Sequence, residues 1–144
     1  MAIILNAHYS DRLELIFHCD GREYPFSFKE EHVYKLSNGK LLFIPMHMKF
    51  DFASIPNILK PLFKNLDKCA VAFAVHDCLY ITDYKRNRLG AKKARKFADL
   101  EMLKILNKVR PESKIQNKVL YLGCRWFGTQ IYNEVDTKYS QYYD

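Results

Sequence analysis

Short apolar runs separated by turn residues fill the first third of the chain. Two pairs of runs flank the dipeptides Asp20-Gly21 and Asn38-Gly39: residues 13–18 with 23–28, and residues 33–36 with 40–44. These dipeptides tolerate the positive φ angles of tight turns, so the pattern predicts two hairpins within residues 1–50. We expect them to form a small N-terminal antiparallel β-meander.

Apolar positions recur with helical spacing from about residue 66 onward. The spacing predicts a three-helix layer over residues 67–133, with helices at 67–82, 90–109 and 112–132. On the middle helix, the basic side chains are expected on the solvent face: Lys92, Lys93, Arg95, Lys96, Lys104 and Lys108. The predicted fold class is therefore α+β.

Two further segments complete the expected organisation. Residues 45–62 connect strands and helices, and this proline-punctuated segment is expected to be a functional loop. Residues 134–144 form a polar, tyrosine-rich tail. Because the chain has 144 residues, we expect a single domain spanning residues 1–144.

Composition and charge narrow the class of protein. Hydrophobic residues make up 49% and charged residues 27%, which is typical of a globular domain. No apolar run approaches the ~20 residues of a transmembrane helix, and the N-terminus lacks a basic leader, so we expect a soluble intracellular protein. The four cysteines form no C-x-x-C pair and are expected to be reduced core thiols: Cys19, Cys69, Cys78 and Cys124. The net charge of +7 permits contact with nucleic acid, an anionic membrane surface or an acidic protein.

The motif His76-Asp77-x-x-Tyr80 lies in an otherwise apolar predicted helix. Its first and last residues share a helix face at i, i+4, and Asp77 points about a quarter-turn away. If the next helix packs antiparallel, Asp99 can reach a ring nitrogen of His76 and orient it as a general base. A structural hydrogen-bond network between two helices accounts for the same residues.

Two weaker signals involve charge. Asp51 and Ser54 are spaced as in a local capping turn. If this loop folds onto the His76 helix, Asp51 and Asp77 together could supply oxygen ligands for a divalent cation, with calcium favoured. The basic run through Lys92 and Lys93 could follow phosphates or lipid headgroups. It has no interleaved aromatic residues, so a solvated helix face is the simpler interpretation and nucleic acid a minor alternative.

The order of several of these motifs along the chain resembles the pattern of a family of phage and prophage proteins, the domain-of-unknown-function family 1353. The residues that carry the resemblance are 44–45 (IP), 51–56 (DFASIP), 74–80 (AVHDCLY), 98–99 (AD) and 125–128 (RWFG). The family pattern includes His-Asp-x-x-Tyr, Arg-x-x-Ala-Asp and a late Arg-x-Phe-Gly. The likeness runs from about residue 40 to about residue 130. It implies a phage protein, located in the bacterial host cytoplasm or in the virion.

A looser resemblance links the His-Asp-x-x-Tyr helix and the later Ala-Asp to the bacterial, fungal and parvoviral phospholipase A2 pattern. It implies that His76 is the base acting through water, that Asp77 holds calcium, that Asp99 orients the histidine and that Tyr80 supports this network. The glycine-rich calcium loop of those enzymes has no counterpart in residues 57–67.

Two hypotheses follow. The first is a small metal-assisted hydrolase of ester or amide bonds, directed at lipid or cell envelope, with His76, Asp99 and Tyr80 catalytic and Asp77 with Asp51 at the metal. The second is a non-catalytic virion, tail or counter-defence protein that binds a phage or host protein, in which the His/Asp cluster is structural. Under either hypothesis the candidate binding residues are Ser54, Lys92, Lys93 and Arg125.

Overall fold

The computed structural model describes residues 3–5, 15–17, 26–46, 48–50, 69–82, 84 and 86–134, with side chains over 28–46, 48, 69–82, 84 and 86–128. The strands are β1 (Ile3–Leu5), β2 (Leu15–Phe17), β3 (Phe26–Phe28), β4 (His32–Lys35), β5 (Leu41–Ile44) and β6 (Lys49–Phe50). The helices are α1 (Ala70–Ile81), α2 (Arg86–Leu89), α3 (Ala91–Val109), the 3-10 turn η4 (Pro111–Ser113) and α4 (Lys114–Glu134). Strands followed by helices confirm the α+β fold class.

The strands of both expected hairpins pair antiparallel, but they lie in different sheets, and the Asp20-Gly21 turn lies outside the described residues. β2 and β3 pair antiparallel, as do β4 and β5. The strand orders are β1-β4-β5 and β2-β3-β6, with β1 parallel to β4. At the β4–β5 turn, Gly39 has a φ of 82° and the Lys40 amide donates to Asn38 Oδ1 over 3.0 Å. The Asn-Gly pair therefore acts as the turn that its conformational freedom predicts.

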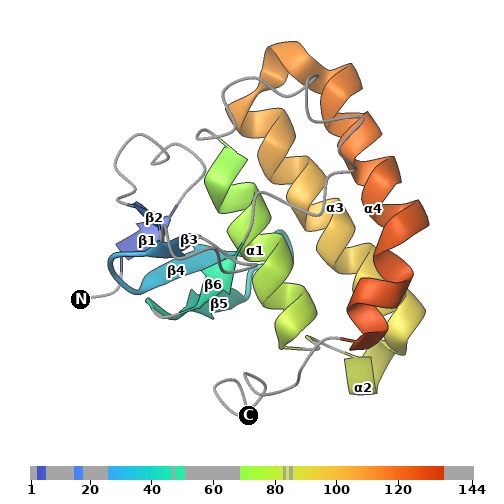
Figure 1. Ribbon diagram of the computed structural model, residues 1–144, viewed down its shortest axis with the longest axis horizontal. Helices are drawn as coiled ribbons and strands as arrows, with labels where there is room; N and C mark the ends of the chain where they lie inside the picture. Colours follow the sequence, from blue (N-terminus) through green and yellow to red (C-terminus); the bar gives the residue numbers. More distant parts are fainter. Residues whose placement is uncertain are drawn as a thin grey trace.

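α1 is the central helix of the fold. Figure 1 shows it between the strands on one side and the α3–α4 hairpin on the other. Residues 70–75 are buried on every side, as expected for a helix without a polar face. Leu42 and Ile44 of β5 join the same core, while Leu41 and Phe43 alternate outward. This packing places the His76 motif in the interior.

The three predicted helices are confirmed as α1, α3 and α4, with bounds that shift by a few residues. The short α2 precedes α3, and Pro111 begins η4 as expected from its position. No helix in the described ranges is long and apolar enough to cross a bilayer. Residues 51–62 of the expected functional loop and residues 135–144 of the tail lie outside the described ranges.

A buried carboxylate joins α3 to the β4–β5 turn. Glu101 is 2% exposed, and it accepts hydrogen bonds from the backbone amide and the hydroxyl of Ser37. Lys104, whose side chain is 54% exposed, approaches the same carboxylate from one turn later on α3. The hydrogen bonds from Ser37 to the buried carboxylate carry more of the interaction than the ion pair with Lys104, because solvent screens the exposed lysine.

We expect Glu101→Ala to lower the free energy of unfolding by about 2 kcal/mol, because it removes two hydrogen bonds to a buried charged acceptor. Lys104→Met is the matched control and should change it by less than about 0.5 kcal/mol. Urea denaturation of the three proteins measures both effects. Equal stability of Glu101→Ala and wild type would show that this contact does not hold the turn on α3.

Candidate functional site

The carboxylate of Asp99 is the centre of the site. Asp99 lies on the inner face of α3 and is completely buried. Its Oδ1 accepts from His76 Nε2 over 2.7 Å and from the Tyr80 hydroxyl over 2.5 Å. Its Oδ2 accepts from Arg125 Nη1 over 2.7 Å. Donors from α1 and α4 therefore satisfy both oxygens of one residue on α3.

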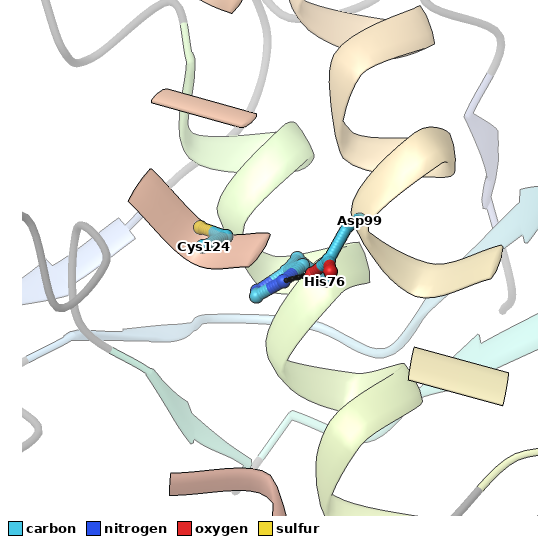
Figure 2. A group of neighbouring side chains, drawn as sticks. All are labelled: His76, Asp99 and Cys124. Carbon is cyan, nitrogen blue, oxygen red and sulfur yellow. Dashed lines mark hydrogen bonds and ion pairs between the residues drawn. The ribbon is translucent and has the colours of Figure 1, made fainter. Parts of the chain in front are cut away.

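The positions of the donors follow from helix geometry. His76 and Tyr80 are separated by one turn of α1, and their ring centroids lie 4.2 Å apart, so both side chains meet the same carboxylate. Arg125 comes from α4, the second arm of the α3–α4 hairpin. Figure 2 shows His76, Asp99 and Cys124 converging from α1, α3 and α4. The expected contact between His76, Tyr80 and Asp99 is thus present, and the structure adds Arg125 to it.

Arg95 corrects the expectation that the basic residues of the middle helix all face solvent. Its side chain is 8% exposed and points at α4, where Nη1 donates to the carbonyls of Cys124 and Arg125, and Nη2 donates to that of Arg125, each over 3.2 Å. The burial has a physical reason, because Arg95 precedes Asp99 by one helical turn and shares the face that α4 covers. The Arg-x-x-Ala-Asp spacing is the signal that could have identified it. Lys92 and Lys93 are exposed, as expected.

The surrounding charges set the protonation of the site. Burial by itself lowers the pKa of His76, but the carboxylates of Asp77 and Asp99 outweigh burial and raise it from 6.5 to about 9. Burial raises the pKa of Asp99, yet His76, Tyr80 and Arg125 bring it below its usual value. Burial and then Asp99 raise the pKa of Tyr80. At neutral pH the site is therefore a carboxylate held by an imidazolium, a guanidinium and a phenol.

The two ring nitrogens of His76 have different surroundings. Nε2 is committed to Asp99, whereas Nδ1 has no hydrogen-bond partner among the residues that the structure describes. The carboxylate oxygen Oδ1 of Asp77 lies 3.5 Å from Nδ1. The Asp77 side chain is 18% exposed, compared with 7% for that of His76. Nε2 therefore contacts the buried carboxylate of Asp99, and Nδ1 lies next to the partly exposed carboxylate of Asp77.

The described residues do not fit the calcium ion that the phospholipase-like pattern implies. Calcium takes six to eight oxygen ligands. Within the described ranges, the only cluster of three or more ligand atoms is His76, Asp99 and Cys124, which offers nitrogen, oxygen and sulfur within 4.8 Å of one another. Arg125 already supplies the cation for Asp99. Asp51 and Ser54 lie outside the described residues.

Two further residues of α4 lie against the site. Cys124, expected as a core thiol, lies beside His76 and Asp99. A Cβ at Gly128 would lie 3.1 Å from the Tyr80 hydroxyl and 3.4 Å from Arg95 Nη1. The absence of a side chain at Gly128 therefore lets α4 approach the site closely. Gly128 belongs to the 125–128 (RWFG) motif, whereas nothing in the sequence around Cys124 indicates its position, which depends on how α4 packs on α1 and α3.

We expect Gly128→Ala to be less stable than Gly123→Ala by at least about 1 kcal/mol, although alanine is the better helix former at both positions. The added Cβ at position 128 presses on a hydroxyl that is fixed by Asp99, whereas at position 123 it meets nothing within 4 Å. Thermal and urea unfolding of the two variants provides the comparison. An equal gain in stability for both would mean that α4 does not pack tightly at Tyr80.

The raised pKa of His76 predicts a pH-dependent stability. Below pH 6.5 both the folded and the unfolded chain bind the proton, so the stabilisation is fully present. Between 6.5 and about 9 only the folded chain keeps the proton, so the stabilisation is lost progressively as the pH rises. Denaturation at several pH values should show wild type losing stability relative to His76→Gln across this range. A difference that stays constant with pH would contradict the assignment.

Sequence comparison places the chain in a family. No curated protein and no solved structure gives a significant match. The family described as "Protein of unknown function (DUF1353)" matches residues 26–124. This stretch includes His76, Tyr80, Arg95 and Asp99 and ends at Cys124, just before Arg125. The chain therefore belongs to the DUF1353 family of proteins of unknown function.

Proposed function

We propose that this protein hydrolyses ester or amide bonds, with His76 as the proton carrier and Asp99 as the residue that orients it. The observation that supports this function best is the difference between the two nitrogens of His76. One is held by a fully buried carboxylate, and the other has no hydrogen-bond partner among the described residues. A base oriented by a third group in this way is a recurring arrangement in acyl-transfer enzymes.

In the proposed reaction, Nδ1 of neutral His76 takes a proton from the attacking group as that group bonds to the substrate carbonyl carbon. Asp99 stabilises the imidazolium that forms. The same proton then passes to the leaving oxygen or nitrogen as its bond to carbon breaks. Tyr80 and Arg125 act as positioning residues, because their hydrogen bonds go to Asp99 rather than to the reacting atoms.

The partly exposed members of the cluster indicate where a substrate would arrive. Asp77 and Arg125 have side chains 18% and 16% exposed, whereas Asp99 is completely buried. A substrate would therefore meet these two side chains before the buried dyad. The pairing of one acidic and one basic group beside an apolar helix suits a polar head on an otherwise apolar acyl compound.

A second candidate function is a non-catalytic one, and the extent of burial favours it. The cluster joins three helices and contains several charged groups that are almost out of contact with water, as a structural clasp would. In this account the resemblance to phage and prophage proteins implies a virion or counter-defence role. The partner would be a phage or host protein, or an anionic membrane surface, at the basic side chains of Lys92 and Lys93.

His76→Gln should lower kcat/KM for ester hydrolysis by at least about a hundredfold, because general-base catalysis contributes that much or more. The test uses p-nitrophenyl esters of increasing chain length and a phospholipid dispersed in detergent, at pH 7 and pH 9. Wild-type hydrolysis should increase with pH as neutral His76 becomes more abundant. Lys108→Gln, which changes an exposed side chain at the far end of α3, is the control and should retain the wild-type rate.

Two results would reject the hydrolase. One is the absence of hydrolysis of every substrate by the folded wild-type protein. The other is an equal rate in wild type and in a folded His76→Gln variant. In either case, a large loss of thermal stability in Asp99→Asn would support the structural clasp, because this change leaves Arg125 and the His76 imidazolium without their buried counterion.

A further inference from the structure

Cys124 lies close to the proposed dyad. Its Sγ lies within 4.8 Å of a ring nitrogen of His76 and of a carboxylate oxygen of Asp99. In Figure 2 the side chains of Cys124 and Asp99 extend from helices on opposite sides of His76. A thiol, an imidazole and a carboxylate are the three groups of a cysteine-dependent acyl-transfer site.

The structure holds Cys124 in this position through its neighbours. Arg95 donates hydrogen bonds to the carbonyls of Cys124 and Arg125. Arg125 is bound to Asp99, and Gly128, one turn later, allows α4 to reach Tyr80. These contacts fix α4 on the same residues that orient His76. The distance from Cys124 to the dyad is therefore set by buried interactions rather than by a surface loop.

The described cysteines differ in their access to reagents. Cys69 and Cys78 are both 0% exposed, and their sulfur atoms contact Arg110 and the Phe43 carbonyl, respectively. Cys124 is only partly buried. Its sulfur lies within 4.8 Å of a ring nitrogen of His76, whose side chain is 6% exposed. Reactive cysteines are typically accessible and close to a base, whereas structural ones are buried and inert.

We propose that Cys124 is the nucleophile of the reaction and forms an acyl-thioester with the substrate. The inference rests on the proposed hydrolase function and extends it from direct attack by water to a covalent, two-stage reaction. It also defines the substrate class as a compound with an acyl group that can be transferred to sulfur, such as an ester or an activated amide.

The proposed reaction has two stages, acylation of Cys124 and hydrolysis of the thioester. In the reactive form the thiol proton resides on His76, so a thiolate faces an imidazolium. The thiolate attacks the carbonyl carbon, a C–S bond forms, the bond to the leaving oxygen or nitrogen breaks, and His76 gives its proton to that atom. Water then gives a proton to His76 and attacks the thioester. The C–S bond breaks, the carboxylic acid leaves, and the proton is again shared between His76 and the Cys124 sulfur.

The first experiment measures thiol reactivity without a substrate. Wild type and His76→Gln are treated with iodoacetamide at pH 7, and peptide mass spectrometry gives the alkylation rate of each cysteine. Cys124 should react at least about tenfold faster in wild type than in the variant, because the imidazolium favours the thiolate. Cys69 and Cys78 in the same molecules are internal controls and should be slow in both. Equal rates at Cys124 in the two folded proteins would overturn the inference.

The second experiment looks for the acyl-enzyme and needs only wild type and Cys124→Ser. With an excess of p-nitrophenyl acetate, wild type should release about one equivalent of p-nitrophenol in a burst and carry an acetyl group on Cys124 after acid quenching. Cys124→Ser should show neither. Because this comparison does not involve His76→Gln, it decides the question even if that variant fails to fold.

The outcomes separate this inference from the proposed function. Hydrolysis at equal rates by wild type and Cys124→Ser, without an adduct, would overturn the nucleophile and leave the His76–Asp99 hydrolase in place with water as the attacking group. A Cys124 acetyl adduct without turnover would support the nucleophile and reject the hydrolase. The absence of the adduct, of turnover and of accelerated alkylation would overturn both.

Discussion

The buried negative charge of Asp99 is the constraint on which the helical part of the structure depends. A carboxylate with no exposed surface costs several kcal/mol unless charged or hydrogen-bonding groups compensate it. Its compensation comes from His76 and Tyr80 on α1 and from Arg125 on α4, so the three helices must meet in one relative position. Removing Asp99 would leave the His76 imidazolium and Arg125 without their buried counterion, which is a strongly destabilising way to disturb such a cluster.

The same constraint determines what the site can do chemically. Because Asp99 occupies Nε2 of His76, only Nδ1 can exchange a proton with another group. Packing α4 against Asp99 also brings Cys124 to the imidazole. A cluster of paired charges is an inefficient means of stabilising a core, since well-packed apolar residues often do it as well or better.

Local patterns predicted most of the elements, and contacts distant in sequence account for what they missed. Asn38-Gly39 and the helical spacing of α3 predict structure within a few residues, whereas the parallel pairing of β1 with β4 depends on strands far apart in the chain. The contact of His76 and Tyr80 with Asp99 could be predicted because i, i+4 spacing fixes one face of α1. A charged residue in a helical pattern is predicted to face solvent, so the sequence places Arg95 on the exposed face of α3. It is buried because α4 covers that face. The contacts of Cys124 and Gly128 with the site depend on this packing, although Gly128 lies in the 125–128 (RWFG) motif.

The protonation state of His76 tests the role of Asp99 most directly. Nitrogen-15 NMR of the imidazole ring, recorded as a pH titration on wild type and Asp99→Asn, reports which ring nitrogens carry protons. The account predicts that both nitrogens of His76 are protonated at neutral pH in wild type, that the ring titrates near 9, and that the midpoint falls markedly in Asp99→Asn. A neutral His76 at pH 7, titrating at or below 6.5 in both proteins, would show that the Asp99 carboxylate does not control the histidine.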